Sequence, residues 1–281
     1  MISGKAKCAG VVGWPVAHSL SPRLHNHWLR ANGIDGAYIP LPIPQESLAH
    51  VLKGLRQAGF KGVNLTIPHK EAAFALAHRL DDAARAAGAV NLLIFHENGT
   101  LEGRNTDADG LAESLKAANV SLNGAPAVLL GAGGAARAAV LALDKIGAGE
   151  IRIVNRHADR AASLAVQLAP FVKAKLSAAT DWPKAAADAK LLVNATSAGM
   201  KSQPALDLPL DPLPKDAAVC DLVYNPLETD LLARAAARGH KTVDGLGMLM
   251  HQAVPSFAAF YGVTPTVTPE LRVELELALS K

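Results

Sequence analysis

The sequence predicts an α/β protein with two domains, and three observations support this prediction. The chain has 281 residues, which is more than one hydrophobic core usually holds and fits two domains. Hydrophobic residues make up 50% of the chain but aromatic residues only 4%, so we expect a core of Ala, Val, Leu and Ile. Apolar runs alternate with amphipathic segments along the chain, which is typical of βαβ units with parallel strands.

Charge and cysteine content exclude several kinds of protein. The 28 Lys and Arg residues nearly balance the 25 Asp and Glu residues and form no basic run, so we expect no nucleic-acid partner. No apolar stretch reaches the roughly 18 residues that span a bilayer, and the N-terminus lacks the apolar run of a signal peptide. Cys8 and Cys220 both lie in apolar runs and fit buried, reduced thiols. We therefore expect a cytoplasmic protein with no membrane partner.

The first part of the chain alternates between strand and helix signals. We expect strands at 8–13, 36–43 and 62–68, helices at 21–33, 45–59 and 107–118, and a hairpin within 89–107 that turns at Asn98 and Gly99. The prolines within 36–43 place that strand at a sheet edge. Ser21 is expected to cap the helix that follows it, with Pro22 at the first helical position.

The second part of the chain repeats a strand–helix pattern more clearly. We expect a strand, a glycine loop and a helix in 127–147, strands at 150–156, 189–200, 217–226 and 241–249, and helices at 158–169, 228–240, 248–262 and 268–279. Residues 107–244 therefore form one predicted domain of nucleotide-binding type. Residues 1–106 and 245–281 together form the other domain.

The glycine loop "VLLGAGGAARAA" is the best-defined motif. Gly131, Gly133 and Gly134 permit a tight turn and let the backbone approach a pyrophosphate, while the helix after them offers amide donors. A tight βα turn without a ligand is the alternative. The apolar strand before the loop and the amphipathic helix after it favour a Rossmann-type, doubly wound dinucleotide-binding domain. The predicted cofactor contacts of the loop are Gly131, Ala132, Gly133, Gly134 and Ala135.

The end of the next strand indicates which dinucleotide binds. An NAD site usually has a carboxylate there for the ribose 2′-hydroxyl, whereas this chain has Asn155, Arg156 and His157. The Arg156 guanidinium can face a 2′-phosphate, and His157 can add a donor, so the sequence predicts NADP(H). A solvated arginine at a strand end is the alternative, and nearby Asp159 leaves NAD open.

Polar residues also gather in the first domain. Ser19 and Ser21 precede a predicted helix, where hydroxyls and free amides can hold a carboxylate. His25 and His27 diverge at helical spacing and too few other ligands accompany them, so we expect no metal site. Further hydroxyl, amide, ammonium and carboxylate groups lie near strand ends, where open α/β sheets bind ligands; they are Asn64, Thr66, Lys70, Asn91, Asn105, Thr106, Asp107 and, on a late helix, Gln252.

Nine motifs in this order make the chain resemble the shikimate dehydrogenase family over nearly its whole length. They are "GWPVAHSLSP", "GVNLTIPHK", "AVN", "NTDADG", "GAGGAARA", "NRHADRA", "NATSAGM", "DLVYNP" and "GLGMLMHQ". The chain departs from the family pattern at Leu65, where Val is usual, at His157, where Thr is frequent, and at Ala198, where a larger apolar residue is common.

The resemblance implies a role for each site residue. Lys70 and Asp107 would form the catalytic pair, and Ser19 and Ser21 would hold the substrate carboxylate. Ring hydroxyls would be bound by Thr66, Asn91, Asp107 and Gln252, and Tyr224 would line the site. Further cofactor contacts would be Thr196, Leu222, Gly245 and Met248. The N-terminal domain would bind substrate and be rejoined by the C-terminal helices.

The chemistry of the implied reaction fits these side chains. Reduction of a ketone by hydride creates an alkoxide that needs a proton, which a positioned ammonium such as Lys70 can donate. Asp107 would orient that ammonium, and nicotinamide supplies the redox chemistry. The expected reaction is the reversible NADPH-dependent reduction of 3-dehydroshikimate to shikimate in aromatic amino-acid biosynthesis.

Three alternatives are compatible with the same motifs. The first is a quinate/shikimate dehydrogenase that uses NAD, although quinate-using relatives often have Thr in place of Ser21. The second is a non-catalytic NADP-binding regulator, which loss of Lys70 or Asp107 would favour, and both are present. The third is a folate-type dehydrogenase, against which the serine pair argues. The sequence is compatible with a homodimer but does not give the oligomeric state.

Overall fold

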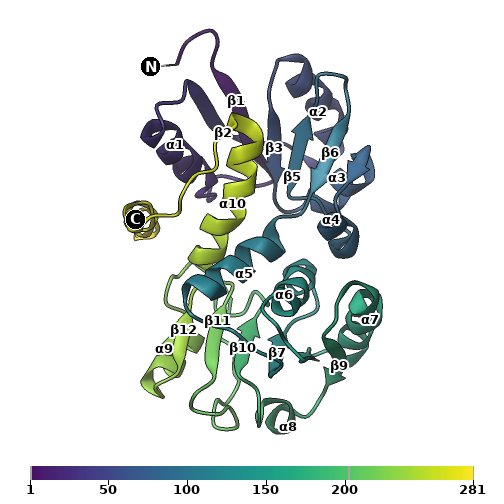
Figure 1. The fold of residues 1–281 in the computed structure, drawn as a ribbon, viewed down its shortest axis with the longest axis vertical. Coiled ribbons are helices and arrows are strands. Elements are labelled where there is room, and N and C mark those ends of the chain that lie inside the picture. The colour runs from purple at the N-terminus through teal and green to yellow at the C-terminus, as the bar shows by residue number, and fades with distance from the viewer. Residues whose placement is uncertain (1, 202, 281) are drawn as a thin grey trace. The chain divides into compact units, whose positions relative to one another are not determined.

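The protein folds into two compact α/β units (Figure 1). The structure is a computed structural model and describes residues 2–201 and 203–280. Unit 1 contains the chain up to Thr106 and from Gln252 onward, and unit 2 contains Asp107–His251. Each unit has its own six-stranded sheet, so the expected two-domain α/β class is confirmed. The chain returns from unit 2 to unit 1 within helix α10, whereas the sequence analysis placed this boundary at residue 245. The boundaries of the functional domains stay a prediction.

The sheet of unit 1 is mixed. Its strand order is β2-β1-β3-β5-β6-β4, with parallel pairs around β1 and antiparallel pairs β3–β5 and β5–β6. The strands are β1 (Lys7–Gly13), β2 (Gly36–Pro42), β3 (Gly62–Leu65), β4 (Arg79–Leu80), β5 (Leu92–Phe95) and β6 (Leu101–Arg104). The helices are α1 (Ser21–Ala31), α2 (Leu48–Gln57), α3 (Lys70–Leu76), α4 (Asp82–Ala87), α10 (Gly245–Tyr261) and α11 (Pro269–Leu279), with a short 3₁₀ turn η1 (Gln45–Ser47).

Several expectations for unit 1 are confirmed and others are wrong. Strand β2 lies at the sheet edge, and the hairpin β5–β6 surrounds the Asn98–Gly99 turn. Ser21 does not cap helix α1; it is the first helical residue, and Leu20 holds the cap position. The strand expected over 62–68 ends at Leu65, because the chain turns there toward α3. The sequence did not reveal β4 and α4, which are short.

Unit 2 has a sheet whose pairings are all parallel. The strands are β7 (Pro126–Leu130), β8 (Glu150–Val154), β9 (Lys175–Ala179), β10 (Leu191–Asn194), β11 (Ala218–Asp221) and β12 (Lys241–Val243), in the order β12-β11-β10-β7-β8-β9. The helices are α5 (Asp107–Ala117), α6 (Gly134–Lys145), α7 (Ala158–Leu168), α8 (Trp182–Ala186) and α9 (Asp230–Ala237), followed by the start of α10; a 3₁₀ turn η2 (Ala169–Phe171) follows α7. Read outward from β7, this order is that of the doubly wound dinucleotide-binding fold, which confirms the Rossmann-type prediction.

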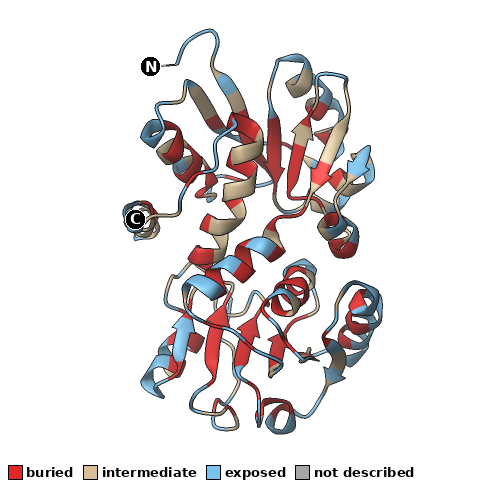
Figure 2. Cartoon of the chain, in the orientation of Figure 1, coloured by how far each residue is buried: buried red, intermediate tan, exposed pale blue. Residues whose placement is uncertain are grey.

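Successive side chains of each strand point to opposite faces of the unit 2 sheet, and helices cover both faces. Ala127 and Leu129 of β7 belong to the core under α5, α6 and α7, whereas Val128 and Leu130 belong to the core under α8 and α9. Both faces are apolar, so β10 and β11 are buried throughout (Figure 2). Such strands read as continuous apolar runs, and this is why the sequence signal was clear.

Three elements of unit 2 differ from expectation. The strand expected over 241–249 ends at Val243, because the Asp244 carboxylate accepts a hydrogen bond from the Leu246 amide as helix α10 begins. The sequence did not reveal edge strand β9 or the short helix α8.

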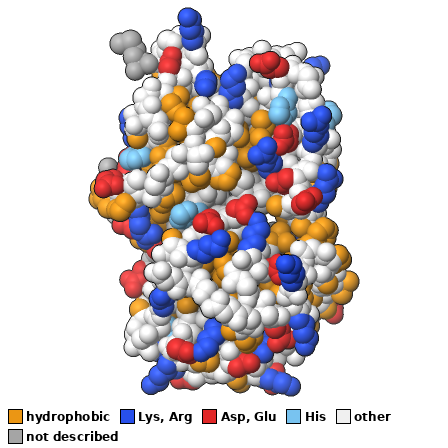
Figure 3. Space-filling view, in the orientation of Figure 1, with side chains coloured by type: hydrophobic (Ala, Val, Ile, Leu, Met, Phe, Trp, Pro, Cys, Tyr) orange, Lys and Arg blue, Asp and Glu red, His pale blue; other side chains and the backbone are white. Residues whose placement is uncertain are grey.

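The surface carries both signs of charge. On the face shown in Figure 3, Lys and Arg side chains are interspersed with Asp and Glu. Within the part of the chain that the structure describes, every helix is too short or too polar to cross a membrane.

Candidate active site

The glycine loop joins the carboxyl ends of three strands in unit 2. Gly131 has φ of +107°, a conformation that favours glycine, and its amide donates to the Val154 carbonyl at 2.9 Å. A Cβ at Gly131 would lie 3.1 Å from the Ala195 carbonyl oxygen and 3.2 Å from the Thr196 methyl carbon. The loop therefore brings the end of β7 against the segments that follow β8 and β10, and a side chain at this position would push them apart.

The start of helix α6 is open to a ligand. Gly133 occupies the N-cap position and no side chain caps the helix. A Cβ at Gly133 or Gly134 would meet no heavy atom within 4 Å. The first amides of the helix can therefore donate to an anion, which the helix dipole also favours.

A pocket of about 540 Å³ lies against this loop within unit 2. Its walls come from the segments after β7, β8 and β10 and from the chain before residue 210; they are Leu130–Gly133, Val154–His157, Arg160, Ala195–Ala198, Gln203, Pro204, Leu206 and Leu208. Arg156, His157 and Arg160 give it three groups that are or can become positive, and none of its described lining residues is a carboxylate. This donor set fits a cofactor that carries a phosphate on its ribose.

Arg160 is a pocket residue that sequence reasoning missed. It lies in the first turn of α7, four residues after Arg156. A helix that starts directly after a strand-end arginine brings a second basic residue to the same pocket, and this spacing was the available signal. The Asn155 side-chain amide donates to the His157 carbonyl at 3.0 Å and so fixes the turn between β8 and α7.

A buried polar chain supports the opposite wall of the pocket. The Thr196 hydroxyl donates to Asn194 Oδ1 at 2.7 Å, and Asn194 Nδ2 donates to Asp221 Oδ1 at 2.9 Å. The Thr229 hydroxyl donates to the other oxygen of Asp221 at 2.7 Å. Burial raises the pKa of Asp221, which is fully buried, and hydrogen bonds from the Thr229 hydroxyl, the Val223 amide and the Asn194 side chain offset part of that cost. Asn194 and Asp221 are the first residues of the motifs "NATSAGM" and "DLVYNP", but the sequence analysis assigned neither of them a role.

Five of the residues expected to bind the cofactor do not line this pocket. Gly134 and Ala135 are exposed at the start of α6. Leu222 and Met248 pack against the unit 2 core, and Gly245 lies so close to the Leu222 backbone that a Cβ there would clash with it. Cofactor contact by these five stays a prediction.

In unit 1, the serine pair lies at the start of helix α1. The Ser21 amide donates to the Ser19 hydroxyl at 3.3 Å, so the two residues hold one short loop. Ser19 is half-buried and Ser21 is buried. The structure therefore brings the two hydroxyls to the helix start that the sequence predicted.

The turn between β3 and α3 carries Thr66 and Lys70. The Thr66 amide donates to the Val12 carbonyl at 2.9 Å, and the Trp14 amide donates to the Ile67 carbonyl at 3.2 Å. Lys70 is the first residue of α3 and its carbonyl accepts the Val90 amide at 2.9 Å. Since Asn91 follows Val90, the backbone holds Thr66, Lys70 and Asn91 in one neighbourhood of unit 1.

Asn91 and Gln252 meet through Thr106. The Asn91 side chain accepts the Thr106 amide at 2.9 Å and donates to its hydroxyl oxygen at 3.0 Å and to Gln252 Oε1 at 3.4 Å. The Thr106 hydroxyl also lies 2.9 Å from the Gln252 carbonyl oxygen, to which it donates. Two residues that are 161 positions apart thus share one polar cluster, which we call the Thr106 cluster: Asn91, Thr106 and Gln252.

Asp107 and Tyr224 belong to unit 2. Asp107 opens helix α5, directly after Thr106 in the chain. Tyr224 follows β11 and is half-buried, and burial raises the pKa of its hydroxyl. Because Lys70 lies in unit 1, the pairing of Lys70 with Asp107 stays a prediction, as does the contact of Tyr224 with substrate.

The histidines that raised the metal question have other roles. His25 is buried and stacks on Tyr38 with ring centroids 3.9 Å apart, and His27 pairs with Glu274 at 2.7 Å. Across residues 2–201 and 203–280, the structure contains no group of three His, Cys, Asp or Glu residues arranged to hold a metal ion.

Comparison with known proteins gives the family. Residues 11–93 match the family described as "Shikimate dehydrogenase substrate binding domain", and residues 111–202 match "Shikimate / quinate 5-dehydrogenase". A relative from Paramagnetospirillum magneticum, named "Shikimate dehydrogenase (NADP(+))", is 52% identical over 96% of this chain and 98% of its own length. The chain belongs to the shikimate dehydrogenase family.

Two solved structures of this family and its relatives share the fold. Shikimate 5-dehydrogenase from Thermus thermophilus, solved in complex with NADP(H) and shikimate, is 41% identical with a TM-score of 0.86 over 97% of this chain and 99% of its own. Quinate dehydrogenase from Corynebacterium glutamicum, solved in complex with NAD, is 30% identical with a TM-score of 0.88 over 96% of this chain and 99% of its own.

Proposed function

We propose that this protein catalyses the reversible NADPH-dependent reduction of 3-dehydroshikimate to shikimate, a step in aromatic amino-acid biosynthesis. The observation that carries the choice of cofactor is the pocket of unit 2. Arg156, His157 and Arg160 line this one cavity, and none of its lining residues that the structure describes is Asp or Glu. A 2′-phosphate needs such donors, whereas a ribose 2′-hydroxyl is usually bound by a carboxylate. The glycine loop and the open start of α6 hold the pyrophosphate of the same cofactor.

The residues of unit 1 bind the substrate. Ser19 and Ser21 hold its carboxylate at the start of α1, and Thr66, Asn91 and Gln252 bind its ring hydroxyls. Asn91 and Gln252 are already fixed by Thr106, so their orientation costs little conformational entropy when substrate binds.

Lys70 handles the proton. When bound, the cofactor supplies or removes the hydride at the reacting carbon. The Lys70 ammonium donates a proton to the carbonyl oxygen as the ketone becomes an alcohol, and the resulting amine takes the proton back in the reverse direction. Asp107 orients the Lys70 side chain and binds the neighbouring ring hydroxyl.

Two further assignments belong to the same proposal. Residues 1–106 and 245–281 form the substrate-binding domain and residues 107–244 form the NADP-binding domain. The protein works in the cytoplasm with small molecules and assembles as a homodimer. Hydrogen exchange in the presence of shikimate or NADP⁺ tests the domains, because each ligand protects its own segments. Light scattering tests the assembly against the 29.2 kDa mass of one chain.

One assay tests the reaction itself. Initial rates are measured for shikimate and quinate, each with NADP⁺ and with NAD⁺. We expect the shikimate and NADP⁺ pair to be fastest. A faster rate with quinate and NAD⁺ would support the alternative dehydrogenase, and no turnover with any pair would support a non-catalytic NADP-binding regulator.

A further inference from the structure

His69 is a fully buried side chain that the proposed reaction does not use. It precedes Lys70 and holds the N-cap position of α3, but its ring does not cap the helix. The ring nitrogen Nε2 lies 2.8 Å from the Ile43 carbonyl oxygen. A carbonyl oxygen only accepts hydrogen bonds, so Nε2 carries the hydrogen and donates it.

The other ring nitrogen fixes the charge state of His69. Nδ1 is buried and has no hydrogen-bond partner within the described part of the chain. A proton there would be a buried donor without an acceptor, which is costly, so the ring stays neutral. Burial lowers the pKa of His69 in agreement with this arrangement.

The hydrogen bond of His69 connects two segments that otherwise meet through β1. Ile43 follows strand β2, and its amide donates to the Gly13 carbonyl at the end of β1 at 3.2 Å. A Cβ added to Gly13 would come within 2.6 Å of the Thr66 methyl carbon. The turn between β3 and α3 therefore packs closely on the end of β1. The end of β1 thus contacts both Ile43 and the Thr66–Lys70 turn. The His69 ring joins these two segments directly to each other.

We infer that His69 is a positioning residue, which holds the turn carrying Thr66 and Lys70 through its hydrogen bond to the Ile43 carbonyl. The inference rests on the proposed function, in which these two residues meet the substrate. His69 acts only through the backbone. The turn is bonded to β1 through Thr66, to Trp14 directly after β1 through Ile67, and to the segment before β5 through Lys70. His69 adds the hydrogen bond to the segment after β2. A shift of about 1 Å in a catalytic group can cost roughly 100-fold in rate, so this tie affects turnover.

A matched pair of variants tests the inference. His69→Gln keeps an N–H donor at a similar reach, whereas His69→Met has a similar length and no donor. We expect His69→Met to lower kcat about 10- to 100-fold with little change in the KM for NADPH, because the cofactor pocket lies in unit 2. His69→Gln should recover most of that loss. In the Lys70→Ala background, His69→Met should lower kcat much less than in the wild type, because its effect passes through Lys70.

Amide hydrogen exchange gives a second measurement that needs no turnover. We expect faster exchange of the 66–70 amides in His69→Met than in the wild type or His69→Gln. If the wild type reduced no substrate, the proposed function would fail, but hydrogen exchange would still test whether the His69–Ile43 hydrogen bond holds the turn. The inference is overturned if His69→Met exchanges and turns over like the wild type. It is also overturned if both variants lose activity equally, since the ring shape would then matter and the hydrogen bond would not.

Discussion

The two units present their polar groups in opposite ways. In the pocket of unit 2, Arg156 and Arg160 line a cavity whose described lining residues include no carboxylate, and no side chain caps the first amides of α6. In unit 1, the members of the Thr106 cluster bond to one another at 2.9–3.4 Å. A multiply charged cofactor is attracted by unmatched positive groups, whereas the hydroxyl groups of a small ring are recognised by donors and acceptors that are already oriented.

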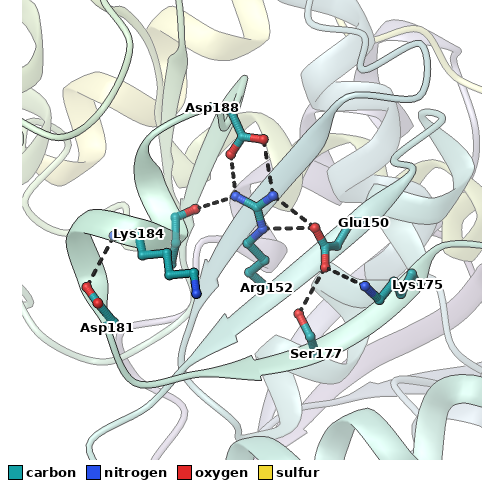
Figure 4. Close-up of polar contacts among 8 residues, drawn as sticks. Glu150, Arg152, Lys175, Ser177, Asp181, Lys184 and Asp188 are labelled. Carbon is teal, nitrogen blue, oxygen red and sulfur yellow. Dashed lines mark hydrogen bonds and ion pairs between the residues drawn. The ribbon is translucent and has the colours of Figure 1, made fainter.

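Two arginines, one within strand β8 and one just after it, sharpen this comparison within unit 2. Arg152 lies in the middle of β8, where its guanidinium pairs with Glu150 and Asp188 and donates to the Ala185 carbonyl at 2.9 Å (Figure 4). Lys175 and Ser177 of edge strand β9 contact the same Glu150 carboxylate. Arg156, four residues later, forms no ion pair with any described residue and lines the pocket. The same residue type therefore joins neighbouring elements in mid-strand and lines a pocket after the strand end.

Removal of Lys70 should have the largest effect, and that effect should appear in catalysis rather than in cofactor binding. We expect Lys70→Ala to lower kcat about 10²- to 10⁴-fold, because the alkoxide loses its proton donor. The KM for shikimate and the Kd for NADPH should change little. Steady-state kinetics and a fluorescence titration with NADPH check both statements, and near-normal kcat in this variant would refute the role of Lys70.

Removal of Arg156 should have the next largest effect, confined to the cofactor. Arg156→Ala deletes a charge-assisted donor, which is worth about 1.5–3 kcal/mol, so the KM for NADPH should rise roughly 10- to 100-fold. The KM for NADH should change far less, because NADH lacks the 2′-phosphate. Arg156→Lys is the control that keeps the charge and loses the planar fork. Equal effects on NADPH and NADH would contradict the assignment of Arg156.

A substitution in the Thr106 cluster tests the pre-oriented polar groups of unit 1. Thr106→Val keeps the shape of the side chain and removes its hydroxyl, which leaves Asn91 Nδ2 and the Gln252 carbonyl with one partner fewer. We expect a loss of about 1–3 kcal/mol in unfolding free energy and a several-fold rise in the KM for shikimate. The KM for NADPH should stay unchanged, and a change in it would show that the two halves are not independent.

Removal of Arg152 should have the smallest effect and should not touch the kinetics. Arg152→Met removes the contacts that Arg152 makes in Figure 4 and should lower unfolding free energy by about 1–2 kcal/mol, since the partners are partly exposed. Urea unfolding measures the loss. An altered KM for NADPH in this variant would remove the distinction between Arg152 and Arg156.

The contribution of Arg152 should also depend on pH. A hydrogen bond from Arg152 holds the pKa of Asp188 below its ordinary value of 3.8. Burial opposes ionisation of Glu150, but the hydrogen bonds and charges of Arg152 and Lys175 together outweigh it and hold that pKa below 4.5. Carboxyls with lowered pKa add stability above their ordinary values and lose it as pH falls through the folded values. The difference in stability between wild type and Arg152→Met should therefore be full at neutral pH and shrink in acid.

Sequence patterns predicted the longer, buried strands and helices and missed the short or exposed ones. Strands β7, β10 and β11 were recognised because both of their faces are apolar. Strand β9 and helix α8 were missed, since an edge strand with exposed residues and a helix of five residues have no clear period. Ser21 was misplaced by one position, because a serine before a proline signals a helix start without fixing which residue is the cap.

The sequence by itself determined the alternation of elements, the glycine loop, the basic strand end and the order of motifs that marks the family. These are local properties, written within a few residues of one another. Only the tertiary structure decided that Arg160 lines the pocket of unit 2, that Thr106 ties Asn91 to Gln252, and that His69 bonds to Ile43. Such contacts depend on which strand ends lie side by side, and that is set by sheet order and packing, which no short stretch of sequence encodes.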